Sequence, residues 1–74
     1  MSDVAKVVTI IGNSPESFAQ AAQVAVTEAA RTIRGITGAD VVSMSCDVEG
    51  DRITMYRTTV NIAFGVERGG GGGG

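Results

Sequence analysis

The sequence predicts an α+β domain in which one helix packs on a small sheet of three strands. Three observations lead to this prediction. The segment 4–11, VAKVVTII, is rich in β-branched residues, which favour strands. Residues 15–34 repeat small apolar side chains at three- and four-residue steps, as one face of a helix does. Residues 39–49 and 52–66 alternate in polarity around Gly50 and Asp51, which is typical of an antiparallel hairpin.

The first predicted strand, 4–11, carries apolar residues on both faces and is followed by Gly12. Such a strand is expected to be covered on both sides. The helix is then predicted to begin after Ser14, whose side chain can accept from an unpaired amide of the first turn. Pro15 and Glu16 suit that turn, because proline has no N–H to leave unpaired and an acidic residue favours the positive end of the helix dipole. The alternative is that this helix end binds an anion.

The predicted helix has an alanine-rich apolar stripe, which would let it lie close to a sheet. We expect it to end near Arg34, with Gly35 in the left-handed conformation. The stripe consists of Phe18, Ala22, Ala25, Val26, Ala29 and Ile33.

The two hairpin strands are predicted to have one apolar and one mixed face. The apolar face holds Val42, Met44, Cys46, Val48, Val60, Ile62, Phe64 and Val66. The mixed face holds Val41, Ser43, Ser45, Asp47, Met55, Arg57, Thr59, Asn61 and Ala63. One helix can cover only one face of the sheet. We therefore expect the mixed face to be covered by another copy of the chain.

The composition narrows the classes of function. A single domain is predicted for residues 1–68, and residues 69–74 are a glycine tail expected to be flexible. Cys46 is the sole cysteine and there is no histidine, so neither a disulfide within the chain nor a histidine-containing zinc site can form. Without a histidine base, Cys46 is expected to fill space in the core, and we predict that the protein is not an enzyme.

The formal charge is −2, from six basic and eight acidic residues, and no basic face is evident. We therefore expect no nucleic-acid partner. No apolar run is long enough for a membrane span, and no signal peptide is indicated. With its lone cysteine, the protein is expected to be cytoplasmic.

Three carboxylates are close together at the predicted turn: Asp47, Glu49 and Asp51. Their oxygens suit Ca²⁺ or Mg²⁺, although one hairpin supplies too few of them for a complete calcium site. Symmetry in an oligomer could gather more, and the alternative is that they are solvated turn charges.

Four segments carry a resemblance to a known family: KVVTIIGNSPESF, AVTEAARTIRGI, ADVVSMSCDVEGDRI and YRTTVNIAFGVE. Over residues 6–67 the chain resembles the dodecins. The resemblance implies a β-α-β-β subunit whose three-stranded antiparallel sheet wraps around the helix, and assembly into a hollow homododecamer. It also implies a non-enzymatic binding or storage protein, in which riboflavin, FMN or a related flavin is held between subunits.

Two positions depart from the dodecin pattern. Gly38 stands where flavin-binding members have the tryptophan on which the flavin ring stacks, and Arg57 stands where a glutamine commonly contacts the ring edge. Losing the aromatic surface removes stacking and buried area, and arginine offers donors but no acceptor. We therefore expect flavin binding to be weak or absent. The candidate ligand site between subunits comprises Gly38, Asp40, Ser43, Ser45 and Arg57.

Alternatives remain for both positions and for the function. Gly38 could serve only to relieve crowding where the chain enters the strand. Arg57 could pair with Asp40 or Asp47 of a neighbouring copy, or it could bind an anion. The natural ligand is not specified by the sequence, and the alternative function is a structural shell or a Ca²⁺- or Mg²⁺-binding dodecamer without flavin.

Overall fold

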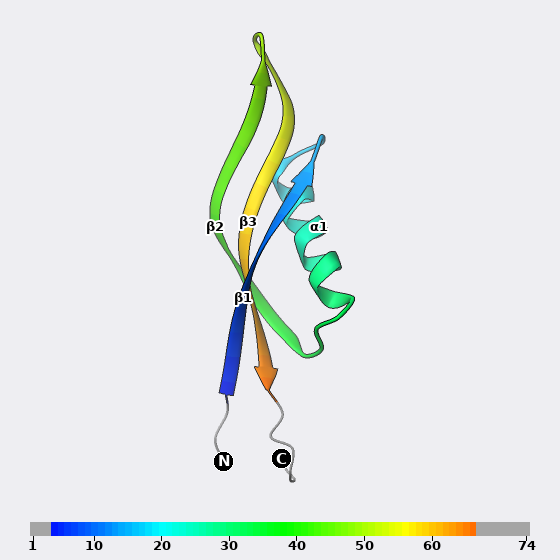
Figure 1. The fold of residues 1–74 in the computed structure, drawn as a ribbon, viewed down its shortest axis with the longest axis vertical. Helices are drawn as coiled ribbons and strands as arrows, with labels where there is room; N and C mark the ends of the chain where they lie inside the picture. Colours follow the sequence, from blue (N-terminus) through cyan, green and yellow to red (C-terminus); the bar gives the residue numbers. More distant parts are fainter. Residues whose placement is uncertain (1–3, 67–74) are drawn as a thin grey trace.

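The computed structural model describes residues 4–66 and has the predicted order of strand, helix, strand, strand (Figure 1). The elements are β1 (Val4–Ser14), α1 (Phe18–Ala30), β2 (Ile36–Glu49) and β3 (Arg52–Val66). The glycine tail predicted for residues 69–74 lies outside the described residues, as do both ends of the domain predicted for residues 1–68.

The three strands form one antiparallel sheet with β3 in the centre, in the order β1-β3-β2. The helix α1 covers one face of this sheet beside β1 and β3, and the hairpin of β2 and β3 extends beyond it (Figure 1). Gly50 forms the tip of the hairpin with a positive φ of 67°, which glycine adopts without strain. The predicted turn and the antiparallel hairpin are thus confirmed.

The core lies between α1 and β3 and is small. Its buried apolar residues are Ala21, Ala25, Ala29, Val60 and Ile62. The alanines form the helix side, which confirms that small side chains bring the helix close to the sheet. The helix backbone lies close to Gly12 in β1, where a Cβ atom would lie 2.0 Å from the carbonyl oxygen of Ala21.

The helix begins later than predicted. Ser14 is the last residue of β1, not the N-cap, and its Oγ accepts from the N–H of Glu16 at 3.0 Å. The N-cap is Ser17, which has extended backbone and accepts from the N–H of Gln20 at 2.9 Å. The prediction failed because pairing with β3 extends β1 as far as Ser14, opposite Tyr56.

The helix also ends earlier than predicted, at Ala30 and not near Arg34. The amides of Thr32 and Ile33 both donate to the carbonyl of Ala29, which closes the last turn. Gly35 does have the expected positive φ, at 77°, but it directs the chain into β2 and does not cap α1.

Irregularities in β2 change which side chains share a face. The register shifts between Val41 and Ser43, so Val41 pairs with Val60 while Ser43 pairs with Thr59. Because paired residues share a face and Val60 is buried beneath the helix, Val41 lies on the helix side. Its predicted place on the mixed face is wrong, because a β-bulge reverses the alternation of faces along β2, and no sequence pattern predicted this bulge.

Within residues 4–66, no helix has the length and apolar character that a membrane-spanning segment requires.

Candidate ligand-binding face

The sheet face opposite α1 has no covering element within the described part of the chain, and we call it the open face. Its position follows from β3, whose buried residues Thr58, Val60 and Ile62 point to the helix, so that the odd-numbered neighbours point away. The open face comprises Val7, Thr9, Ile11, Asn13, Gly38, Asp40, Ser43, Ser45, Asp47, Met55, Arg57, Thr59, Asn61 and Ala63.

All five residues predicted for the ligand site are on this face. Gly38 is opposite Ala63, Asp40 is opposite Asn61, Ser43 is opposite Thr59 and Ser45 is opposite Arg57. Strict alternation would have separated the even positions 38 and 40 from the odd positions 43 and 45. The bulge near Val42 brings them together.

Arg57 is held between the two outer strands. Its Nε donates to Oδ1 of Asn13 at 3.1 Å, and its Nη2 donates to Oδ2 of Asp47 at 3.0 Å. Asn13 belongs to β1 and Asp47 to β2, so these contacts connect all three strands. Arg57 therefore forms an ion pair with Asp47 of its own chain, which lies diagonally across the hairpin. The predicted ion pair was with Asp40 or Asp47 of a neighbouring copy.

Gly38 is exposed, and a Cβ atom there would have no heavy atom within 4 Å. Its φ is not positive, so the backbone does not require glycine. The interpretation that Gly38 relieves crowding is therefore wrong within a single chain. A Cβ atom at this position would therefore clash with nothing in the same chain.

A second polar contact lies in the centre of the open face. The hydroxyl of Thr9 donates to Oδ1 of Asn61 at 2.7 Å. This contact fixes the amide of Asn61, so its NH₂ group is directed away from Thr9. Asp40 is on the other side of Asn61 in the register. The face therefore presents an oriented amide between its polar and its apolar parts.

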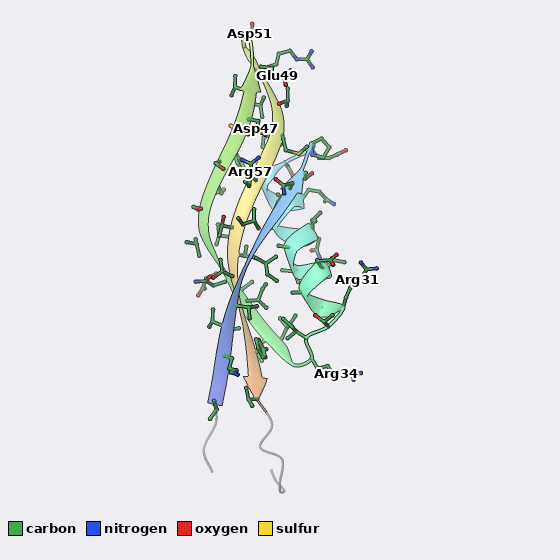
Figure 2. The ribbon with its side chains drawn as sticks, in the orientation of Figure 1. Arg31, Arg34, Asp47, Glu49, Asp51 and Arg57 are labelled. Atoms are coloured by element: carbon green, nitrogen blue, oxygen red, sulfur yellow. The ribbon has the colours of Figure 1, made fainter. Side chains whose placement is uncertain are left out.

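The three carboxylates of the predicted metal site follow one another along the hairpin (Figure 2). In the described residues, no three histidine, cysteine, aspartate or glutamate side chains come together as a metal site. Asp47 is occupied by Arg57, while Glu49 and Asp51 lie closer to the turn (Figure 2). A site made by several copies stays a prediction.

Much apolar surface remains exposed on both faces of the sheet. Val7 and Ile11 are more than half exposed on the open face. The helix-facing side of β2 is also uncovered, because α1 packs mainly on β1 and β3. The exposed residues there include Val41, Met44 and Val48. Cys46, predicted to fill the core, is only partly buried beside Tyr56.

Sequence reasoning missed Asn13 and Thr9 as members of the candidate site. Asn13 lies beyond the predicted end of the first strand at residue 11, and Thr9 lies within a strand that was predicted to be covered on both sides. The sequence left open that the first strand continues past Gly12 to Asn13 and Ser14, because a β-strand can contain a single glycine.

The amino-acid sequence of this β-α-β-β chain matches the model of a protein family. The model described as dodecin matches residues 4–67. The chain belongs to the dodecin family. Because the match covers the whole described region, the family assignment applies to the subunit as a whole and confirms the resemblance noted in the sequence.

Solved dodecin structures have the same fold. An arginine-to-alanine variant of the Thermus thermophilus dodecin is 24% identical and has a TM-score of 0.86, with 90% of this chain and 100% of that chain covered. The Streptomyces coelicolor dodecin is 24% identical with a TM-score of 0.85, covering 89% and 94%. The Streptomyces davaonensis dodecin is 22% identical with a TM-score of 0.86, covering 92% and 100%. Among curated proteins, none matches this sequence significantly.

Proposed function

We propose that this dodecin is a non-enzymatic, self-assembling protein that binds a small flavin-type ligand between copies of its open face. The observation that carries the proposal is that all five candidate residues, from Gly38 to Arg57, occupy one uncovered face. Family membership supports the class of ligand. The absence of histidine from the sequence supports a binding role over an acid–base enzyme.

Self-association is supported by the balance between buried and exposed apolar residues. Among residues 4–66, the buried apolar side chains larger than alanine are Val60 and Ile62, whereas ten large apolar residues are exposed, including Val7, Ile11 and Met44. Large exposed apolar surfaces mark interaction sites. The proposed assembly is the hollow dodecamer of the family, and multi-angle light scattering would measure its mass.

The proposed affinity for flavin is low, because Gly38 provides no surface on which a ring can stack. An aromatic side chain contributes a large buried area and about 0.5–1.5 kcal/mol more from stacking. In the same chain, no heavy atom lies within 4 Å of a Cβ atom added at position 38. We therefore attribute the low affinity to the missing aromatic contact and not to a clash at this position within the chain.

The test is a fluorescence titration of riboflavin and FMN with the wild type and with Gly38→Trp. We expect weak quenching with the wild type and at least about tenfold tighter binding with Gly38→Trp, since tenfold corresponds to about 1.4 kcal/mol. Gly38→Leu is the matched control, because leucine adds apolar area without a ring. Light scattering on each variant verifies that the assembly is intact.

Submicromolar flavin binding by the wild type would contradict the proposed role of Gly38. An intact assembly in which neither the wild type nor Gly38→Trp binds flavin would contradict the proposed function. That result would favour the alternative, a structural shell or a Ca²⁺- or Mg²⁺-binding assembly. Calorimetry with Ca²⁺ on the wild type and on Asp47→Asn/Glu49→Gln would then separate these two possibilities.

A further inference from the structure

The charged groups of the open face are one arginine and two aspartates. Arg57 is 34% exposed and its partner Asp47 is 52% exposed, with 3.0 Å between Nη2 and Oδ2. Asp40 lies farther along the same face, opposite Asn61. The formal charge of the face is therefore −1, although its most prominent donor is an arginine.

An isolated arginine is a good ligand for phosphate and carboxylate, because its planar group matches two oxygens and keeps its charge. Arg57 differs from such a residue in two ways. Asn13 and Asp47 fix the orientation of its guanidinium, and the Asp47 carboxylate offsets its charge. The guanidinium has further N–H groups, and the described part of the chain gives them no hydrogen-bond partner.

We propose that Asp47 is a selectivity residue of the open face, which holds Arg57 in place and prevents it from binding anionic groups. The pair of Arg57 and Asp47 then presents oriented donors but has no net charge. Such a group suits an uncharged acceptor, for example a ring carbonyl, and disfavours phosphate and carboxylate. This inference rests on the proposed function for the identity of the face as a binding site, but its chemistry concerns Arg57 and Asp47 alone.

The Asp47 carboxylate would repel an anion bound at Arg57, because the two negative groups would lie close together. An anion in contact with Arg57 would lie only a few ångströms from the Asp47 carboxylate, because the two side chains are themselves in contact. Like charges at such a separation repel strongly enough to change affinity several-fold even at high dielectric. The anion would also have to compete with Oδ2 of Asp47 for Nη2. Both effects act in the same direction, against anionic ligands.

The experiment is a titration with inorganic phosphate at constant ionic strength, followed by the Nε–Hε NMR signal of Arg57. The signal is identified by its loss in Arg57→Gln. We compare the full-length wild type with Asp47→Asn, which has nearly the same shape but no charge. Asp47→Ser is a second charge-removing variant, and Asp47→Glu is the conservative control.

We expect Asp47→Asn and Asp47→Ser to bind phosphate at Arg57 with a dissociation constant at least about fivefold lower than that of the wild type. Asp47→Glu should behave as the wild type does, because it retains a carboxylate. If the ion pair had only a structural role, the charge-removing variants would not bind phosphate more tightly than the wild type. Equal phosphate affinity in the wild type and in both charge-removing variants would overturn the proposal, and so would a gain in Asp47→Glu.

Failure of this inference and failure of the proposed function are distinguishable. The phosphate titration requires no flavin, so its outcome does not depend on whether riboflavin or FMN binds. Absence of flavin binding by both the wild type and Gly38→Trp in an intact assembly would refute the proposed function. Tighter phosphate binding by Asp47→Asn would still support the selectivity role of Asp47.

Discussion

The contact between Gly12 and the helix backbone gives a sharp prediction about stability. A Cβ atom at position 12 would lie 2.0 Å from the carbonyl oxygen of Ala21, 2.9 Å from the amide nitrogen of Ala25 and 3.0 Å from the carbonyl carbon of Ala21. Ordinary van der Waals contact begins at 3.4 Å, so the first distance is 1.4 Å too short. All three atoms belong to the backbone, so no side chain can rotate away to make room.

Relief of the clash in Gly12→Ala requires α1 to move away from β1. That movement would separate the alanine side of the helix from the sheet and open space around Ala25, which is 1% exposed. Overpacking in a core costs about 1–3 kcal/mol. The lower unfolded-state entropy of alanine, compared with glycine, offsets about 0.4–1 kcal/mol of this loss of stability. Because all three clashing atoms belong to the backbone, we expect a cost at the upper end of the first range, and therefore a net loss of about 2 kcal/mol in the free energy of unfolding.

Guanidinium-induced unfolding, followed by circular dichroism, measures this loss. The chain concentration must be the same for each protein, because assembly contributes to the apparent stability. Gly65→Ala is the matched control: Gly65 is also in a strand, its φ is not positive and a Cβ atom there would meet nothing within 4 Å. Gly12→Ala/Ala21→Gly should not recover stability, because the clash involves the Ala21 carbonyl and not its methyl group.

The reasoning would be refuted if Gly12→Ala and Gly65→Ala unfolded at the same denaturant concentration as the wild type. Recovery of stability in Gly12→Ala/Ala21→Gly would also contradict it.

Two further predictions concern polar contacts around the helix. Ser17→Ala should lower the free energy of unfolding by about 1 kcal/mol, because it removes the acceptor for the N–H of Gln20. Ser17→Asp keeps an acceptor and should retain most of the stability. Thermal unfolding measures both variants, and equal losses of stability would show that Ser17 is not the cap. Thr58 is buried and its hydroxyl donates to the carbonyl of Phe18 at 2.9 Å, so Thr58→Val should cost about 0.5–1.5 kcal/mol by removing this hydrogen bond. Thr58→Ser keeps the hydroxyl and is the control; denaturant unfolding in which Thr58→Val is as stable as the wild type would contradict the role of this bond.

The order of the elements could be predicted because each has a local cause. The β-branched run of β1, the alanine repeat of α1 and the glycine at the hairpin turn act within a few residues of chain. Burial of Val60 and Ile62 followed from the two-residue alternation of β3. The same alternation places Tyr56 on the side of Val60, and Tyr56 packs edge to face with Phe18 of α1, with ring centroids 4.9 Å apart.

The candidate site could be predicted only in part. The five residues assigned to it from the resemblance do share a face, but the partners of Arg57 were not predicted within its own chain. Asn13 and Asp47 are 44 and 10 residues away from it in the sequence. Their proximity depends on the register of both outer strands with β3, which no local pattern specifies.

The sequence by itself determined which segments become strands and helix, where the hairpin turns and which side of β3 is buried, because propensity and periodicity are local properties. Only the tertiary structure decided that β1 continues to Ser14, that a bulge moves Val41 to the helix side and that Asp47 holds Arg57. Each of these depends on hydrogen bonds between distant strands. Their energy is set by strand pairing in three dimensions, and a local pattern cannot specify which residues pair.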